Sequence, residues 1–105
     1  MLEINQENFA EEVLNSDKLA LIDFWASWCM PCKIIAPLVE ELAEDLKGEV
    51  KIGKVNVDDN PELSTELSIM NIPTLVIFKE GKEVSRIMGV NSKEAIRAKL
   101  KSFMD

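Results

Sequence analysis

Residues 19–33 read LALIDFWASWCMPCK, and this stretch decides both the fold and the chemistry of the chain. It opens with an apolar run that does not alternate, which is typical of a strand buried on both faces. It ends with both cysteines of the chain, Cys29 and Cys32, where a helix begins. The spacing puts the two sulfurs within reach of one disulfide across a helical turn. The position puts Cys29 beside unpaired amide donors, which stabilise a thiolate. The stretch therefore predicts a redox-active dithiol at the junction of a central strand and a helix.

Composition limits the kinds of protein in which this dithiol can lie. The chain has 105 residues, of which 47% are hydrophobic, so residues 1–105 form one domain with its own core. A formal charge of −7 without a basic stripe argues against nucleic acid and anionic membranes as partners. Residues 1–5 show neither a basic region nor a long apolar run, so we expect no signal peptide. The longest apolar stretch is too short to span a bilayer. We expect a soluble, cytoplasmic monomer.

Two alternatives to a redox pair start from the same cysteines. A closed zinc site needs four ligands, and one chain with two cysteines and no histidine cannot supply them. A site shared between two chains remains as an alternative. A purely structural disulfide is the other one, but closing a four-residue ring contributes only about 2 kcal/mol, against about 4.7 kcal/mol for a 100-residue loop. We therefore favour redox chemistry and expect no metal. The chain has no flavin or nucleotide fingerprint, so we expect no cofactor.

The remaining pattern predicts an α/β domain in the order βαβαβαββα. Besides residues 19–26, the expected strands are residues 2–4, 50–57, 75–79 and 83–88, the last two joined as a hairpin by Glu80-Gly81-Lys82. Four helices are expected. The first follows Asn5, the second begins near the cysteines and ends before Gly48, the third follows Asn60 as its cap, and the fourth spans residues 92–103. Phe9 and Val13 lie on one face of the first helix, and Ile96, Leu100 and Phe103 are buried by the last. A strand-helix-strand crossover implies a parallel core, so we expect a small mixed sheet with helices on both faces.

Unequal positions at the helix start give the two cysteines different roles. Disulfide exchange needs an attacking thiolate and a second thiol that ends the reaction. Cys29 lies nearer the helix N-terminus, so it should be the more exposed sulfur and the nucleophile, with Lys33 adding positive charge nearby. Cys32, one turn inward, should resolve the mixed disulfide.

Asp23 places a carboxylate inside the apolar strand. Burial of an isolated charge is costly and raises the pKa of a carboxyl group. We interpret Asp23 as the proton acceptor for the Cys32 thiol, the alternative being an aspartate that faces solvent. Lys54 has a similar place in the next strand and is a candidate partner of Asp23, although a lysine in a strand often faces water.

Several short motifs follow one another along the chain. They are Asp-Phe-Trp-Ala at 23–26, Trp-Cys-x-Pro-Cys-Lys at 28–33, Ala-Pro at 36–37, Lys-Val-Asn-Val-Asp at 54–58, Ile-Pro-Thr at 72–74, and Gly89. In order and spacing they resemble the thioredoxin family over essentially the whole chain. The resemblance implies the thioredoxin fold, a mixed five-stranded sheet flanked by four helices, with a cis bond before Pro73. It also implies that Pro73 packs beside the sulfurs while the Ile72 backbone pairs with an extended substrate. The substrate-binding residues are then Trp28, Met30, Pro31, Ile72, Pro73, Gly89 and Val90.

The resemblance implies a general protein-disulfide reductase. It would act as an electron carrier on disulfide-containing proteins and be regenerated by a separate thioredoxin reductase. Met30 stands where most members carry glycine, and no histidine lies between the cysteines, which favours a reductant. Two alternatives are a binding module in which the cysteines are incidental and an exported catalyst of oxidative folding. The intact cysteines, Asp23 and Pro73 argue against the first, and the expected lack of a signal peptide argues against the second.

Overall fold

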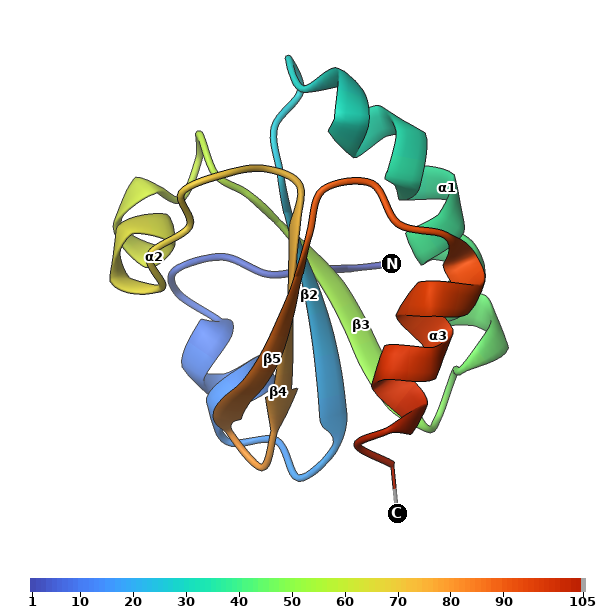
Figure 1. The fold of residues 1–105 in the computed structure, drawn as a ribbon. Coiled ribbons are helices and arrows are strands. Elements are labelled where there is room, and N and C mark those ends of the chain that lie inside the picture. The colour runs from blue at the N-terminus through green and yellow to red at the C-terminus, as the bar shows by residue number, and fades with distance from the viewer. Residues whose placement is uncertain (105) are drawn as a thin grey trace.

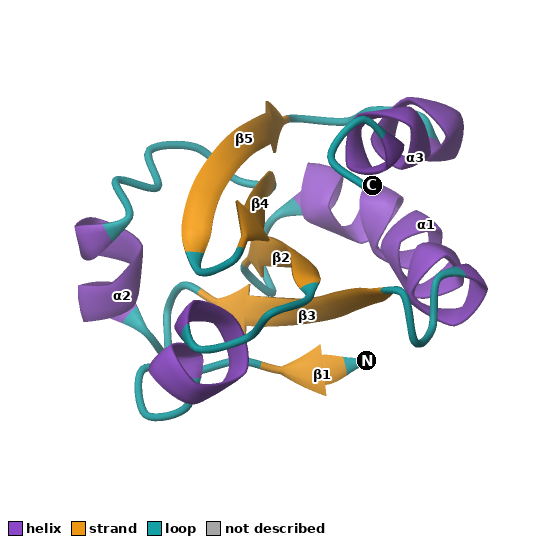
Figure 2. Cartoon of the chain, turned by 90° about the horizontal axis from the view of Figure 1, so that it is seen from below, coloured by secondary structure: helices purple, strands orange, loops and turns teal. Residues whose placement is uncertain are grey.

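Five strands form one mixed sheet in the computed structural model, which describes residues 1–104. The strands are β1 (Leu2–Glu3), β2 (Leu19–Trp25), β3 (Val50–Asn56), β4 (Thr74–Lys79) and β5 (Lys82–Met88), in the spatial order β1-β3-β2-β4-β5. The helices in this part of the chain are η1 (Ala10–Leu14), α1 (Met30–Asp45), α2 (Pro61–Glu66) and α3 (Lys93–Lys101). Helices α1 and α3 cover one face of the sheet, and η1 and α2 cover the other (Figures 1 and 2). The predicted α/β class and element order are confirmed.

Strand β2 is the centre of the sheet. It pairs in parallel with β3, from Leu19 opposite Val50 to Trp25 opposite Asn56, and antiparallel with β4. Helix α1 makes the crossover between β2 and β3, as a parallel pair requires. Strands β4 and β5 form the predicted hairpin, and its turn residues Glu80 and Gly81 both have positive φ angles, 51° and 78°. A turn of that kind matches the twist of the two strands.

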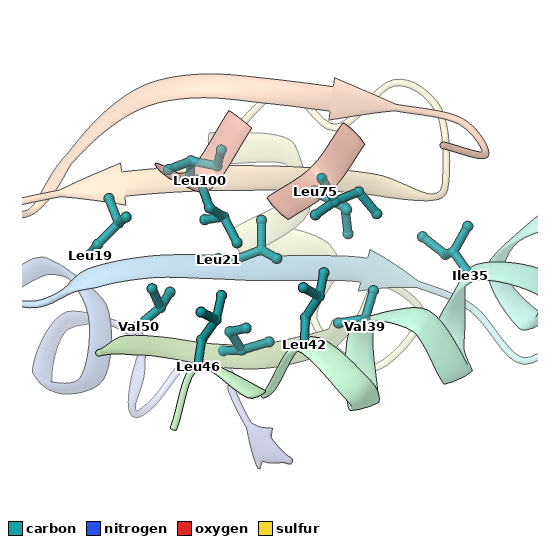
Figure 3. Close-up of a cluster of buried hydrophobic side chains, with 12 residues drawn as sticks. Leu19, Leu21, Ile35, Val39, Leu42, Leu46, Val50, Leu75 and Leu100 are labelled. Carbon is teal, nitrogen blue, oxygen red and sulfur yellow. The ribbon is translucent and has the colours of Figure 1, made fainter. Parts of the chain in front are cut away.

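The core consists of two apolar layers because side chains on β2 alternate between the faces of the sheet. Leu19 and Leu21 face α1 and α3, where fully buried Ile35, Val39 and Leu42 of α1 project toward the strands (Figure 3). Ala20, Ile22 and Phe24 face the opposite way and pack in a layer with Phe9, Val13 and Leu63. Both faces of β2 are therefore buried, as its mostly apolar, non-alternating residues predict. Among residues 1–104, no helix is both long and apolar enough to cross a membrane.

The first helix differs from expectation in its winding. The predicted cap, Asn5, lies in the turn before the helix, where its Oδ1 accepts hydrogen bonds from the backbone N–H groups of Glu7 (2.9 Å) and Asn8 (2.8 Å). The N-cap residue of η1 is Phe9, which makes no side-chain capping bond. The helix that follows is a π-helix, in which the Asn15 N–H donates to the Ala10 carbonyl five residues back. The wider turn still buries Phe9 and Val13 against the sheet. At the other end of the chain, α3 stops at Lys101, so Phe103 lies beyond the helix and is half-buried.

The cap of α2 is a second difference. Asn60 occupies the predicted N-cap position, but its side chain makes no capping bond. Its Oδ1 instead accepts from the Gln6 N–H (3.0 Å), and its Nδ2 donates to the Asn56 carbonyl (3.0 Å). The Gln6 Oε1 accepts from the helix N–H groups of Glu62 (2.9 Å) and Leu63 (3.3 Å). Gln6, which lies 54 residues from Asn60 along the chain, therefore caps α2. The hydrogen bonds between Gln6, Asn60 and α2 connect the N-terminal segment to the helix.

Candidate active site

Cys29 occupies the N-cap position of α1. The chain leaves β2 at Trp25, and Cys29 has extended backbone angles (φ −94°, ψ 110°) before the helix begins at Met30. The Cys29 Sγ accepts a hydrogen bond from the backbone N–H of Cys32 at 3.2 Å, so sulfur fills the place of the usual capping oxygen. Pro31 lies in the first turn, where its missing N–H leaves no gap in the helix. Sulfur in this position receives both an amide hydrogen bond and the positive end of the helix dipole.

A disulfide joins Cys29 and Cys32, whose Cα atoms are 5.3 Å apart. Both residues are buried: Cys29 is 4% exposed and Cys32 is 2% exposed. The expected difference in exposure is therefore slight in the oxidised state, and what separates the two sulfurs is position. Cys29 caps the helix, whereas Cys32 lies within its first turn. The residues beside Cys29 are open to solvent, with Trp28 67% and Met30 66% exposed.

The loop before β4 lies against Cys29. The Ile72–Pro73 bond is cis, as the resemblance implies, and Pro73 is buried. The Ile72 carbonyl oxygen lies 3.8 Å from the Cys29 Sγ. Within residues 1–104, the N–H and C=O of Ile72 take part in no backbone–backbone hydrogen bond. Gly89, after β5, donates its N–H to the Pro73 carbonyl at 3.0 Å and brings the neighbouring Val90 to this end of the sheet.

Arg86 holds the start of the loop that precedes β4, a contact that the sequence did not indicate. Its guanidinium, paired with Glu83, donates to the backbone carbonyls of Leu67 and Ser68 (3.2 Å to the latter), just after α2. Ser68 has a φ of 54°, which is uncommon for a residue other than glycine. An arginine on β5 thus satisfies carbonyls at the start of the segment that leads to Ile72. Nothing local to Arg86 in the sequence signals this contact.

Exposed apolar side chains lie on the segments that flank the disulfide. Of the predicted docking residues, Trp28, Met30 and Val90 (53%) are exposed and Ile72 is half-buried. The Trp28 ring is fixed by a hydrogen bond from its Nε1 to the Asp58 Oδ2 at 2.8 Å. Sequence reasoning missed three further apolar side chains that are exposed, namely Ile34 (58%), Met70 (84%) and Met88 (63%). Ile34 follows Met30 by four residues, a helical spacing that could have identified it.

Asp23 and Lys54 lie side by side on β2 and β3. In the parallel register Leu19 stands opposite Val50, Leu21 opposite Ile52, and Asp23 opposite Lys54. The first two pairs belong to the core under α1, and a period of two puts Asp23 and Lys54 on that same face. Asp23 is 3% exposed. A pocket of ≈ 110 Å³ has Asp23, Lys54 and Cys32 among its lining residues, so these three residues lie around one space.

Burial dominates the titration of Asp23. It raises the pKa of the carboxyl group from 3.8 to about 7, and the positive charge of Lys54 offsets part of the rise. Among the described residues, no ion pair within 4.0 Å joins Lys54 to Asp23; the Lys54 Nζ lies 5.2 Å from the centre of the Trp25 ring. The Asp23 carboxyl therefore exchanges its proton close to neutral pH while remaining buried.

Such an arrangement can exchange one disulfide for another. A capped sulfur can be the thiolate that attacks, a second sulfur one turn away can complete the exchange, and a group titrating near pH 7 can take up a proton between them. Fold and site together define a thiol-disulfide oxidoreductase with a Cys29–Cys32 redox pair.

Comparison with known proteins gives the family. The thioredoxin family model matches residues 1–102. Thioredoxin 2 of Chlorobaculum tepidum is 48% identical over 98 residues, covering 93% of this chain and 90% of that protein. Thioredoxin 1 of Nostoc sp. is 40% identical over 102 residues, covering 97% and 95%. The bifunctional thioredoxin reductase/thioredoxin of Mycobacterium leprae is 41% identical over 95 residues, which are 90% of this chain and 21% of that protein. The chain belongs to the thioredoxin family.

Proposed function

We propose that the chain is a general protein-disulfide reductase, folded as one thioredoxin domain over residues 1–105, in which Cys29 attacks and Cys32 resolves. The observation that carries the proposal is the place of the Cys29 Sγ. It caps α1, and it lies 3.8 Å from the carbonyl of Ile72, whose backbone groups make no backbone–backbone hydrogen bond within residues 1–104. The cysteines alone carry the two electrons of the reaction, so no bound cofactor is needed.

Reduction begins when the Cys29 thiolate attacks one sulfur of a substrate disulfide. A Cys29–substrate bond forms, the substrate disulfide breaks, and the other substrate sulfur leaves as a thiolate that takes a proton from solvent. The amide of Cys32 and the N-terminus of α1 stabilise the Cys29 anion before attack.

Resolution follows through Cys32 and Asp23. The Asp23 carboxylate accepts the Cys32 proton across the pocket that both residues line, and the Cys32 thiolate attacks the Cys29 Sγ. The Cys29–Cys32 disulfide forms and the second substrate thiolate is released, so the substrate gains two electrons and the dithiol loses two. Lys54, opposite Asp23 on β3, favours the ionised carboxylate by its charge. Its proposed partnership with Asp23 is therefore electrostatic and does not require a direct ion pair.

Substrate binding uses the surface around the disulfide. The N–H and C=O of Ile72 pair with an extended substrate backbone, in the manner of a strand added to an edge. Pro73 and Gly89 hold that edge in place through their 3.0 Å hydrogen bond. Trp28, Met30, Pro31 and Val90 offer apolar contact to the substrate side chains.

A separate thioredoxin reductase returns two electrons to the disulfide. Support comes from the Mycobacterium leprae relative, whose name joins a reductase and a thioredoxin in one protein. We place the exchange in the cytoplasm and expect the chain to act as a monomer. Recycling of the disulfide by a purified reductase tests the electron donor, and subcellular fractionation tests the cytoplasmic location.

Trapping experiments test the assignment of the cysteines. The Cys32→Ser variant should hold a protein disulfide substrate such as insulin in a covalent complex through Cys29. The matched Cys29→Ser variant should form no such complex and should reduce nothing. If both variants bound the substrate equally and non-covalently while wild type reduced none of it, the chain would be a binding module instead.

A further inference from the structure

The segment 67–73 begins at the C-terminus of α2 and ends beside the disulfide. Its first residues close the helix: the Ser68 N–H donates to the Thr65 carbonyl (3.0 Å), and the Ile69 N–H donates to the Ser64 carbonyl (2.9 Å). These two bonds form a Schellman motif, in which one residue takes the left-handed conformation, usually glycine. Here that residue is Ser68, with a φ of 54°. A residue with a Cβ is disfavoured in this conformation, so other contacts must hold it there.

Arg86 makes such contacts from β5. Its Nη2 donates to the carbonyl of Leu67 and its Nη1 to the carbonyl of Ser68 (3.2 Å). Carbonyls at the end of a helix have no acceptor role left within the helix, so they need donors from elsewhere. Glu83, also on β5, accepts from the Nε and the Nη2 of the same guanidinium (3.0 Å from Nη2). A carboxylate that accepts two bonds in this way fixes the plane of the guanidinium, and the arginine is therefore oriented toward the two carbonyls.

Strand β5 holds the other end of the segment as well. Gly89, which directly follows β5, donates its N–H to the Pro73 carbonyl at 3.0 Å. The segment is therefore attached at its start through Arg86 and at its end through Gly89. Between these attachments Met70 is 84% exposed, and Ile72 makes no backbone–backbone hydrogen bond within residues 1–104. The part of the segment nearest to a substrate thus depends on two contacts with one strand.

We propose that Arg86 is a positioning residue for substrate binding, which fixes the start of segment 67–73 so that the Ile72 backbone is held ready for an extended substrate chain. The proposal rests on the backbone pairing proposed above for Ile72. A loop that is ordered before binding loses less conformational entropy when the substrate pairs with it. Release of the loop should therefore weaken protein substrates that pair along Ile72. A small disulfide, which needs only the sulfurs, should be unaffected.

The second arginine of the chain provides a matched control. Arg97 on α3 donates to the Asp45 Oδ2 on α1 at 2.7 Å. The two arginine side chains are similarly exposed, Arg86 by 25% and Arg97 by 33%. Helices α1 and α3 lie on the face of the sheet opposite α2 (Figure 2). Arg97→Met therefore removes a comparable ion pair away from segment 67–73, whereas Arg86→Met removes the contacts to it.

Steady-state reduction of insulin, with reduction of a small aromatic disulfide such as 5,5′-dithiobis(2-nitrobenzoate) alongside, tests the proposal. Arg86→Met should raise the KM for insulin about three- to tenfold and leave kcat within about twofold of wild type. Its rate with the small disulfide should equal that of wild type, and Arg97→Met should match wild type with both substrates. An unchanged KM in Arg86→Met, or an equal rise in both variants, overturns the proposal. Equal losses on insulin and on the small disulfide indicate general damage and also overturn it.

Hydrogen exchange of the Ser68 and Ile69 amides gives a second readout in the same variants. Both amides should exchange faster in Arg86→Met than in Arg97→Met, because the end of α2 opens more often without its side-chain donors. A raised KM without faster exchange overturns the positioning role. Arg86→Lys replaces Arg86→Met if the latter does not fold. Lysine keeps the charge beside Glu83 but lacks the planar fork that reaches a carboxylate and two carbonyls together. It should also raise the KM for insulin, and a wild-type KM overturns the proposal.

These measurements separate the proposal from the reductase function itself. If Cys32→Ser traps insulin through Cys29 but Arg86→Met has the wild-type KM, the reductase stands and the positioning role is wrong. If Cys32→Ser traps nothing and wild type reduces no insulin, the reductase proposal is overturned, and the substrate-positioning role of Arg86 is overturned with it. Faster exchange of the Ser68 amide in Arg86→Met would then show a contact that serves the fold alone.

Discussion

Replacing Asp23 by alanine should stabilise the oxidised protein at pH 8. The carboxyl is 3% exposed and its Oδ1 has no partner among residues 1–104. Burial raises its pKa from 3.8 to about 7, so the folded state binds the proton more tightly than the unfolded chain does. The stability that this proton contributes is fully present below the unfolded pKa, and it is lost as the pH rises through the folded one. Above pH 7 the folded protein therefore carries a buried charge at a cost in stability.

The size of the effect follows from the same two pKa values. One pH unit corresponds to about 1.4 kcal/mol, so a rise from 3.8 to about 7 amounts to about 4 kcal/mol in total. About 2.5 kcal/mol of this falls between pH 5 and pH 8. Taking the difference between variant and wild type at each pH cancels the titration of every other group that the substitution leaves undisturbed.

Chemical denaturation with the disulfide intact measures this difference. The free energy of unfolding of Asp23→Ala, relative to wild type, should rise by about 2.5 kcal/mol from pH 5 to pH 8. Asp23→Asn is the control for side-chain size, since it also lacks the titration and should show the same pH dependence. A variant that is less stable than wild type at pH 8 would mean that attraction to Lys54 outweighs burial, and the reasoning above would be wrong.

Two other substitutions test the surface and the hairpin. Met30→Gly should keep the disulfide reductase activity but change the ranking of protein substrates, because it removes an exposed thioether beside Cys29. The substitution should lower the free energy of unfolding by less than about 1 kcal/mol, since Met30 is the first residue of α1. Identical kinetics with wild type across a panel of protein disulfides would contradict the role in specificity. Gly81→Ala should lose more stability than Gly48→Ala, although both glycines have positive φ angles (78° and 87°). The reason is steric: a methyl group at Gly81 would meet the Leu14 carbonyl oxygen, whereas a methyl group at Gly48 would meet nothing within 4 Å. Gly48→Ala should cost about 1–2 kcal/mol from its backbone alone, and equal melting temperatures for the two variants would refute the steric argument.

The parts of the fold that follow from local pattern could be predicted from the sequence. The mostly apolar, non-alternating residues 19–26 predicted the central strand, which spans Leu19–Trp25, and Glu80-Gly81-Lys82 predicted the hairpin. Both could be predicted because a strand buried on both faces and a tight turn each leave a local pattern in the sequence. The same holds for Cys29 and Cys32 at the start of α1. Both cysteines and the proline between them lie at the N-cap and in the first turn of α1, and the bond from the Cys32 N–H to the Cys29 Sγ lies within that stretch.

Features that depend on contacts between distant segments could not be predicted this way. Asn60 has the residue type of a side-chain cap, yet Gln6 caps α2 because tertiary folding brings it there. The anchoring of the Leu67–Ser68 carbonyls by Arg86 has the same origin. The cis bond before Pro73 was expected only from the family resemblance, because no local rule distinguishes it from an ordinary trans bond.

Alkylation of the reduced protein tests the central claim most directly. Brief treatment with iodoacetamide at neutral pH, followed by mass spectrometry of the peptides, shows which sulfur is the available thiolate. The helix cap on Cys29 predicts that Cys29 is modified first and that Cys32 stays protected within the first turn of α1. Modification of Cys32 before Cys29 would reverse the two roles and contradict the account.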